Sequence, residues 1–353
     1  MADFIGTYIV MPDDARIVMA SWILASHIID SFDRFPHLAI TSPEKRCGKT
    51  RCLQLIELLS REAVMTSNMS PAVVYRLIEE KKPTLIMDEA QSLSRQGSEN
   101  SIAIQEIFCA AIDRNAAVHR VGGDRNDEIV QFRVYSPKVV ALIGNLDGVL
   151  ADRCVEVRLA RKTADDSVTR FRSRVVEPDA EKVRESIVAW CTDHAGRVAE
   201  AYDTTDEFDI ANDRMAELML PLQSVVMVDD EESLPALRRF VFELEEQDRQ
   251  AELSTPGVKL LIAAREIFDR VKPDENGGKF LLTKNLIRKL VAREEEEWQR
   301  FSSGRPISAD AIARLLRPYG IRSSRDRTRR KRGYWAHDFD STWERYAPRT
   351  PSP

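Results

Sequence analysis

The chain has 353 residues, of which 43% are hydrophobic and 31% are charged, and its formal net charge is −5. This length allows two or three folded units whose cores need no disulfides, and the acidic balance means that any nucleic-acid contact must be local. Five cysteines without C-x-x-C spacing argue against a zinc ribbon or a disulfide framework and indicate a reducing compartment. No apolar run reaches membrane-spanning length and no signal-like segment opens the chain, so we expect a cytoplasmic protein without membrane contact.

The first half of the chain alternates between helical and strand-like segments. Helix-period apolar residues predict a buried helix over 13–30, and a short apolar run predicts a strand over 37–41. A second helix is expected over 48–60, with further strands over 83–90 and 135–145. This alternation is typical of a largely parallel sheet flanked by helices, so we predict an α/β fold.

The stretch LAITSPEKRCGKT, from Leu38 to Thr50, ends like a phosphate-binding loop. In the usual pattern, G-x-x-x-x-G-K-[ST], backbone N–H groups cradle phosphates, Lys contacts the β- and γ-phosphates and the hydroxyl binds Mg²⁺. Gly48, Lys49 and Thr50 fit this pattern, but Pro43 replaces the first glycine and has no N–H to donate. We therefore expect the ATP-binding residues of the loop to be Glu44, Lys45, Arg46, Cys47, Gly48, Lys49 and Thr50.

Two carboxylates, Asp88 and Glu89, close the next apolar run. In P-loop ATPases such a pair ends a neighbouring strand, where the Asp and the loop hydroxyl, here Thr50, hold Mg²⁺ and the Glu polarises the attacking water. We predict catalysis by Glu89 together with Lys49. The alternative is a solvated acidic turn after a strand.

Three further polar residues are candidates for the site. Asn145 ends the third strand-like run and could sense the γ-phosphate or the attacking water, although asparagine also caps strands. Arg153 precedes another apolar run and could add transition-state charge to the ATP of a neighbouring subunit, with a surface salt bridge as the alternative. Arg214, in the helical region, could be lowered onto the phosphates by a lid or could be a surface charge.

The patterns divide the chain into four parts. Residues 1–175 form the expected P-loop core with its N-terminal helix, and 176–253 are expected to form a helical lid. After the break STPG, residues 254–347 contain three short helices and then a basic stretch, which predicts a winged-helix-like domain with the basic stretch as its hairpin wing. The last residues, 348–353, are expected to be a disordered tail.

The basic stretch from Arg322 to Arg332 contains six arginines and one lysine against one aspartate, and the aromatic residues Tyr334 and Trp335 follow. Such a run is a candidate for contact with a phosphate backbone, with stacking groups beside it. The alternative is a solvated charge run. The predicted DNA-binding residues are Arg325, Arg327, Arg329, Arg330, Lys331, Arg332 and Trp335.

Stretches over most of the chain match one known pattern: SWILASHIIDSFDRFPHLAITSPEKRCGKT, IMDEA, YSPKVVALIGNLDGVLADRCVEVRLARK, NDRMAELMLPL, ISADAIARLLRPYGI and GYWAHDFDSTWERY. They resemble a family of AAA+-like P-loop ATPases of unknown function from phages, prophages and plasmids, which often form the helicase half behind a primase. The opening S-P-E-K is this family's own variant of the loop, so the missing glycine is a family trait.

The resemblance implies a nucleotide site with ATP and Mg²⁺ bound at Lys49, Thr50, Asp88 and Glu89. It also implies a polar sensor at Asn145, where relatives more often carry an acid. Similarity to AAA+ helicases further implies a ring, expected to be a hexamer, because Arg153 acts only if a neighbour supplies the ATP.

We predict a DNA-stimulated ATPase, a helicase or translocase that acts on single-stranded or forked DNA in the replication of a phage or other mobile element inside a bacterial host cell. Longer family members carry a primase part, so priming would here belong to a separate primase or polymerase. Two alternatives stay open. One is an ATP-dependent protein remodeller, helicase loader or defence ATPase, and the other is a DNA-binding initiator that uses ATP only to assemble.

Overall fold

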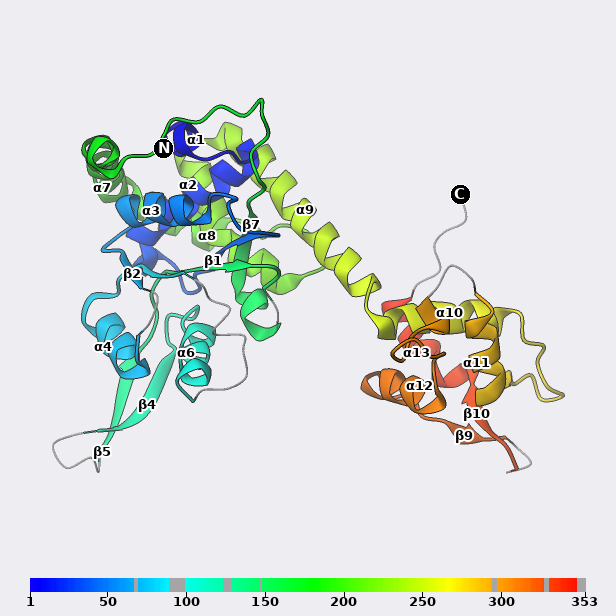
Figure 1. Ribbon diagram of the computed structural model, residues 1–353. Helices are drawn as coiled ribbons and strands as arrows, with labels where there is room; N and C mark the ends of the chain where they lie inside the picture. Colours follow the sequence, from blue (N-terminus) through cyan, green and yellow to red (C-terminus); the bar gives the residue numbers. More distant parts are fainter. Residues whose placement is uncertain are drawn as a thin grey trace. The chain divides into compact units, whose positions relative to one another are not determined.

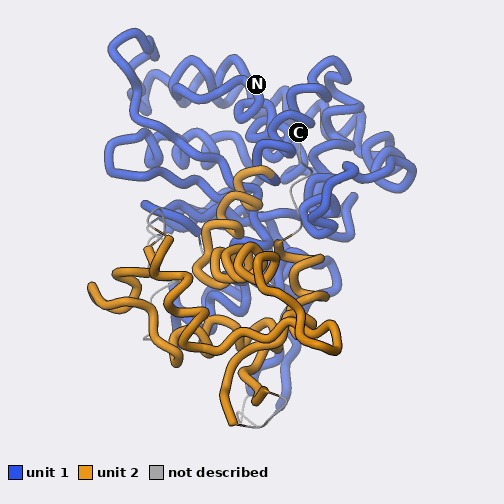
Figure 2. The backbone as a smooth tube through the Cα atoms, turned by 90° about the vertical axis from the view of Figure 1, so that its right-hand side faces the viewer, with its two compact units in different colours: residues 1–245 blue, residues 246–353 orange. Residues whose placement is uncertain are grey.

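The computed structural model describes residues 1–66, 69–88, 99–122, 128–146, 148–293, 297–326 and 330–347. The chain divides into two compact units, residues 1–245 and residues 246–353 (Figure 2), which are described separately below. The boundary lies inside one helix, α9 (Leu234–Leu253). Within the described ranges, no helix combines the length and the apolar character that crossing a bilayer requires.

Unit 1 is built on a five-stranded sheet in which all strands run parallel (Figure 1). In spatial order its strands are β2 (Val64–Thr66), β3 (Leu85–Met87), β6 (Lys138–Ile143), β1 (His37–Ser42) and β7 (Cys154–Arg158). The strands expected from the three apolar runs are β1, β3 and β6, and they lie next to one another. The structure therefore confirms a parallel α/β sheet.

The side chains of these strands alternate between two hydrophobic clusters, because successive residues of a strand point to opposite faces of a sheet. In β1, Leu38 and Ile40 belong to the larger cluster, whereas Ala39 belongs to the smaller one together with Val140 of β6. Both faces of the sheet are therefore buried. This burial explains why the strands are continuous apolar runs in the sequence.

Helices cover both faces of the sheet. The larger cluster contains residues of α2, α3, α7 and α8, and the smaller cluster contains residues of α4 and α6. The helices of unit 1 that precede α9 are α1 (Ala2–Tyr8), α2 (Asp13–His27), α3 (Lys49–Leu59), α4 (Pro71–Lys81), α6 (Glu99–Ala110), α7 (Ser173–Thr204) and α8 (Asp213–Asp229).

Most of the region expected to form a lid, 176–253, is packed into this core, as far as Leu244. Ile187 of α7 and Met219 of α8 share the larger cluster with Trp22 of α2. Along the same face, α7 packs on α3, and α8 packs on α2 and α7. A lid movement of these helices stays a prediction.

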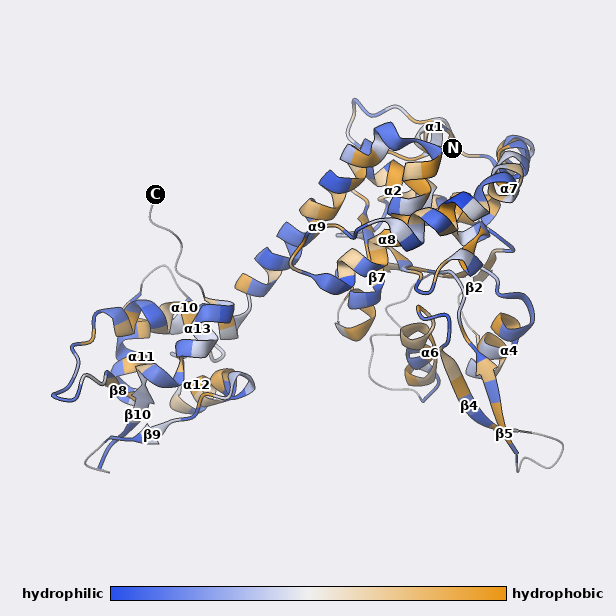
Figure 3. Ribbon diagram, turned by 180° about the vertical axis from the view of Figure 1, so that it is seen from behind, coloured by the Kyte–Doolittle hydropathy of each residue, from blue (hydrophilic) through white to orange (hydrophobic). Residues whose placement is uncertain are grey.

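A two-stranded ribbon has no counterpart among the elements expected from the sequence. β4 (Ala117–Gly122) and β5 (Glu128–Arg133) pair antiparallel, and Figures 1 and 3 show them extending beyond α4 and α6. Toward its far end, Val121 lies opposite Ile129, and these side chains are 68% and 77% exposed. No residue of β5 is fully buried, and Val118 and Phe132 of the ribbon are only partly buried against the smaller cluster, so the ribbon lacks the buried apolar run from which the other strands are predicted.

Unit 2 has a hydrophobic core of its own. After the last residues of α9, the unit continues with a helix whose N-cap, Thr255, accepts the N–H of Val258, so this helix starts at the break predicted at 254–257. A three-stranded antiparallel sheet in the order β8-β10-β9 completes the unit. Its main elements are α10 (Pro256–Asp269), β8 (Phe280–Leu282), α11 (Thr283–Val291), α12 (Ala309–Leu316), β9 (Ser324–Arg325), β10 (Arg332–Trp335) and α13 (Asp340–Tyr346).

Candidate functional site

The phosphate-binding stretch forms the strand, loop and helix that its sequence predicts. β1 ends at Ser42 and α3 begins at Lys49, so the loop spans 43–48. Two loop residues have left-handed backbones, Arg46 with φ 69° and Gly48 with φ 92°. Such turns direct backbone N–H groups into one concavity, and the first turn of α3 adds N–H groups that have no acceptor within the helix. The loop therefore suits an anion.

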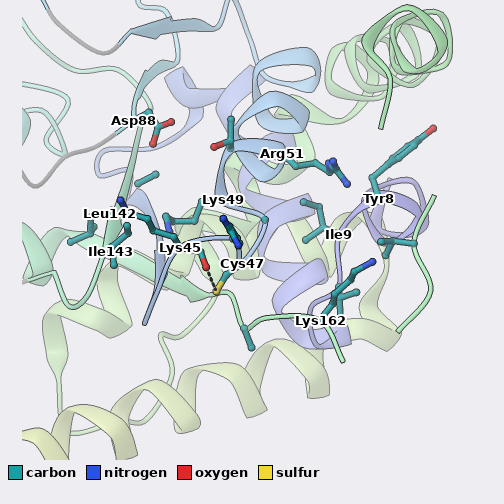
Figure 4. A pocket seen from close by; sticks show the side chains of 17 residues that line it. Tyr8, Ile9, Lys45, Cys47, Lys49, Arg51, Asp88, Leu142, Ile143 and Lys162 are labelled. Carbon is teal, nitrogen blue, oxygen red and sulfur yellow. Dashed lines mark hydrogen bonds between the residues drawn. The ribbon is translucent and has the colours of Figure 1, made fainter. Parts of the chain in front are cut away.

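The loop borders a pocket of about 600 Å³ (Figure 4). Of the loop residues predicted to bind ATP, those from Lys45 to Thr50 line the pocket and Glu44 does not. Asp88 lines the same pocket from the end of β3, as do the last residues of β6. The structure thus gathers the loop cations and the two predicted Mg²⁺ ligands around one space.

The ammonium group of Lys49 has a partner within this strand and loop. Its Nζ donates a hydrogen bond to Ser42 Oγ, and Ser42 Oγ donates to the carbonyl oxygen of Glu44 at 2.7 Å. A hydroxyl is a neutral acceptor, whereas a phosphate oxygen is charged and forms a stronger hydrogen bond with an ammonium group. A phosphate can therefore replace Ser42 as the partner of Lys49.

The residues predicted to hold Mg²⁺ fit the chemistry of that ion. Among the described residues, no group of three or more His, Cys, Asp or Glu side chains gathers to hold a metal. Mg²⁺ needs no such group, because it is usually bound by one or two carboxylates together with substrate phosphates and water. The Thr50 hydroxyl and the Asp88 carboxylate supply hard oxygen ligands in the pocket. Glu89, predicted to polarise the attacking water, lies outside the described residues.

Asn145 follows β6, the strand between β1 and β3. Because parallel strands end at the same edge of a sheet, this order brings the residues after all three strands to one edge. Asn145 itself is exposed, and β6 lines the pocket only as far as Ile143. A sensor role for Asn145 stays a prediction.

Arg153 lies at the opposite edge of the sheet. It ends the 3₁₀ turn η2 (Gly148–Arg153), and the first residue of the following β7 pairs with the first residue of β1. The six residues of β1 therefore separate it from the phosphate loop by roughly 20 Å. Its Nε donates to the carbonyl oxygen of Cys109 at 2.8 Å, and its Nη1 donates to that of Val149 at 2.5 Å. Arg153 cannot reach the pocket of its own chain.

Arg214, predicted to be lowered onto the phosphates, lies near Arg153 instead. It is exposed in the first turn of α8, which packs against η2 and β7, and it does not line the pocket. Both arginines lie close enough to Cys109 to affect its thiol: burial raises the pKa of Cys109, and the two guanidinium charges oppose that rise. In this structure neither arginine lines the pocket of its own chain, so a role for either of them in ATP hydrolysis stays a prediction.

One wall of the pocket comes from segments without any nucleotide motif. These residues are Tyr8, Ile9, Val10, Ala160, Lys162 and Val168. The two segments are joined, since the Thr169 N–H donates to the Thr7 carbonyl oxygen at 2.8 Å and the rings of Tyr8 and Phe171 have centroids 5.7 Å apart. A mostly apolar wall opposite a phosphate loop suits a nucleobase. No local sequence pattern predicts this wall, because tertiary packing alone brings its two segments together.

Glu44 lies in an ion pair beside the loop. Its carboxylate is 3.1 Å from Arg161 Nη2, which also donates to the carbonyl oxygen of Lys45 at 3.4 Å. Both side chains are more than half exposed, at 56% and 55%, so the pair adds little to folding stability. A carboxylate next to a triphosphate is nevertheless repulsive, and Arg161 offsets that charge.

Arg161→Ala is expected to weaken ATP binding about 2- to 5-fold, because the Glu44 carboxylate is then uncompensated. Adding Glu44→Gln to this variant should restore the affinity of the wild type. Calorimetric titration of all four combinations with ATP measures the coupling between the two residues. An equal loss on Arg161→Ala with either residue at position 44 would show that the arginine does not act through this carboxylate.

The predicted DNA-binding stretch forms an antiparallel hairpin in unit 2, with Arg325 opposite Arg332. Asp326, its acidic residue, accepts the backbone N–H groups of Arg330 and Lys331 at 2.9 and 3.1 Å and so links the ends of the two strands. The cationic side chains of the hairpin are all exposed, namely those of Arg325, Arg330, Lys331 and Arg332. Two further predicted contacts lie outside the described residues, namely Arg327 and Arg329.

Tyr334 and Trp335 follow the basic stretch and lie in β10, and only one of them reaches the surface. Tyr334 is 1% exposed and belongs to the core of unit 2, which corrects its interpretation as a stacking group. Trp335 is partly exposed. Stacking on a base is therefore left to Trp335.

Comparison with known families places the chain in one of them. Residues 158–346 match the family described as “Protein of unknown function (DUF3631)”, and because this match spans more than half of the chain, the chain belongs to that family. The matched range begins at the end of β7 and ends with α13, so the phosphate loop and Asp88 lie outside it. No curated protein matches the chain.

Several solved structures are distantly similar. The A form apo structure of the NrS-1 C-terminal region has a TM-score of 0.42 and 11% identity, over 94% of this chain and 77% of that one. Inhibitor-bound JCV helicase has a TM-score of 0.26 and 12% identity, over 71% of this chain and 64% of that one. A second JCV helicase structure has a TM-score of 0.26 and 11% identity, over 73% of this chain and 66% of that one, so less than two thirds of the JCV chain is covered in both. At such TM-scores these similarities carry no argument about function, which rests on the site itself.

Proposed function

We propose that this protein is an ATP-hydrolysing, AAA+-like motor that acts on DNA. The observation that carries the proposal is the pocket shared by the phosphate loop and Asp88 at the carboxyl edge of a parallel sheet. Open α/β sheets bind their ligands at this edge. A helix N-terminus, a lysine, a hydroxyl and a carboxylate around one space fit a nucleoside triphosphate with its metal ion.

Each residue of the pocket has a task in this proposal. Backbone N–H groups between Lys45 and Thr50 hold phosphate oxygens, and the Lys49 ammonium offsets their charge. Thr50 and Asp88 would hold Mg²⁺, which neutralises charge on the transferred phosphoryl group when it is bound. Glu89 orients and polarises the attacking water. The apolar wall receives the base.

The positions of the two arginines support a ring, which we propose to be a hexamer. Arg153 lies roughly 20 Å from its own phosphate loop, so its proposed role requires ATP from a neighbouring subunit. Arg214 lies near it and could share that interface. Asn145 would sense the γ-phosphate or the attacking water on the side of the subunit that binds ATP.

We propose that unit 2 is a winged helix that contacts single-stranded or forked DNA. Its elements follow the order helix, strand, helix, helix, strand, strand, and the β9–β10 hairpin would be the wing. The exposed cations of this hairpin suit a phosphate backbone. The motor would serve replication of a phage or other mobile element in the cytoplasm of a bacterial host, beside a separate primase or polymerase.

The test is the rate of ATP hydrolysis with Mg²⁺, measured alone, with single-stranded DNA and with blunt duplex. Stimulation by single-stranded DNA would support a helicase or translocase. Stimulation by duplex only would favour a DNA-binding initiator, and hydrolysis that no DNA changes would favour a remodeller, loader or defence ATPase. Absence of both ATP binding and hydrolysis in the folded protein would reject the proposal.

Replacing the four described hairpin cations by Ala should reduce DNA affinity and its dependence on salt. Each lost phosphate contact should make the slope of log affinity against log salt shallower by roughly 0.7 to 0.9. Fluorescence anisotropy at several salt concentrations measures both quantities for Arg325, Arg330, Lys331 and Arg332 together.

The matched control is the pair Lys182→Ala and Arg184→Ala, which removes exposed cations from α7 in unit 1. Basal ATPase should survive in the hairpin variant, because these cations do not line the nucleotide pocket. Unchanged DNA affinity and salt slope in that variant would leave the hairpin as a protein adaptor.

A further inference from the structure

The outer face of the small sheet in unit 2 carries aromatic side chains. In β10, Tyr334 points into the core, so the next residue, Trp335, points to the opposite face. In β8, Leu281 points into the core and Phe280 to the opposite face. Because Trp335 is paired with Phe280 in the strand register, the two rings lie side by side on the face turned away from the core.

These rings form a row with His337. The centroids of Phe280 and Trp335 are 4.9 Å apart, and those of Trp335 and His337 are 5.7 Å apart with their planes at 30°. Phe280 also lies over Gly333, where an added Cβ would come within 2.7 Å of its ring. Mutual contact therefore fixes the positions of the rings before any ligand binds. The side chain of His337, at the end of the row, is 67% exposed.

The charge beside this row indicates what it could bind. β10 starts at Arg332, and the exposed Lys331 and Arg330 precede it, so one short strand joins the aromatic row to the basic hairpin. An apolar peptide would make no favourable contacts with these cationic side chains. A nucleic-acid strand matches both features, since its phosphates suit the hairpin and its bases suit the rings. In a duplex the base faces are already stacked on one another, so only unpaired bases can stack on these rings.

We propose that Phe280, Trp335 and His337 form a stacking platform for the unpaired bases of single-stranded DNA, while the hairpin cations hold its backbone. This inference rests on the proposed DNA-binding function of unit 2 and adds the residues that would select single-stranded over duplex DNA. Stacking tolerates any sequence, because every base has a π face. The platform thus discriminates between single-stranded and duplex DNA and not between sequences.

His337→Ala in the full chain tests the platform, because this exposed side chain can be removed with little effect on the core. Affinity for a labelled oligothymidylate should fall by about 5-fold or more, which is typical of the loss of one stacked base. Affinity for a blunt duplex of equal length should not change. His337→Tyr should retain the affinity of the wild type for the oligothymidylate, because it keeps an aromatic ring at the end of the row.

Several outcomes would overturn the platform. They are an unchanged affinity of His337→Ala for the oligothymidylate, an equal loss for duplex, a His337→Tyr variant as weak as His337→Ala, and a wild type that binds neither DNA. The salt slope should stay as in the wild type, since the hairpin cations are intact, and a smaller slope would assign His337 to phosphate contact instead. ATP hydrolysis without DNA is measured in parallel, so that a failed motor with intact stacking, or the reverse, can be told apart.

Discussion

Lys49→Ala is expected to reduce ATP affinity at least tenfold, to the point where binding and hydrolysis are lost. The substitution removes an ammonium group that lines the pocket from the first turn of α3. A hydrogen bond to a charged partner is worth about 1.5–3 kcal/mol, which corresponds to a factor of ten or more in affinity. Alanine is the best helix former, so the fold should persist. Equilibrium titration with a fluorescent ATP analogue measures the change, and the melting temperature checks folding.

Glu89→Gln is the matched variant. An amide cannot polarise water as a carboxylate does, but it leaves the phosphate contacts of the loop in place, so ATP should still bind while hydrolysis stops. The two variants thus separate binding from chemistry. Equal ATP affinity in Lys49→Ala and the wild type would remove this pocket as the nucleotide site.

Arg153→Ala should bind ATP normally and hydrolyse it about 10³-fold more slowly, because an arginine supplied by a neighbour stabilises charge only in the transition state. Mixing this variant with an excess of Glu89→Gln should partly restore turnover. At hybrid interfaces the intact Arg153 of one subunit faces the intact Glu89 of the other. The measurement is turnover at a fixed amount of Arg153→Ala against an increasing amount of Glu89→Gln.

Rescue in such mixtures also controls for folding, because a misfolded Arg153→Ala subunit could not be rescued. A rate per subunit that stays constant on dilution to clear monomer would exclude action in trans.

The parts of the fold that could be predicted from sequence are those that bury a continuous apolar run. β1 and β6 are covered on both faces, so each contains a continuous apolar run, Leu38–Ile40 in β1 and Val139–Ile143 in β6, and Gly48 and Lys49, which follow β1, complete a local motif. Asp88 could be placed near the loop by the same logic, because parallel strands end at one edge. The β4–β5 ribbon buries no such run, so the sequence pattern does not predict it.

The remaining features depend on tertiary packing or on which residues of a strand face the core. A short sequence segment reveals neither. Tyr8 and Val168 line one pocket although they lie 160 positions apart in the sequence, and no local sequence pattern predicts that they come together. Tyr334 and Trp335 are adjacent aromatic residues, and only the register of a four-residue strand decides which one faces the core. The position of Arg214 likewise depends on tertiary packing, since its helix is positioned by contacts with α2 and α7.

The backbone of the phosphate loop affects how relatives of this protein can be found. A search for the sequence motif G-x-x-x-x-G-K-[ST] does not match this chain, because Pro43 stands in the position of the first glycine. The left-handed torsions belong to Arg46 and Gly48, and a Cβ added at Gly48 would meet no heavy atom within 4 Å. The restriction on Gly48 is thus torsional rather than steric. Chains that have drifted far in sequence can keep the site if they keep these two torsions, so a search by backbone geometry would retrieve relatives that a letter pattern discards.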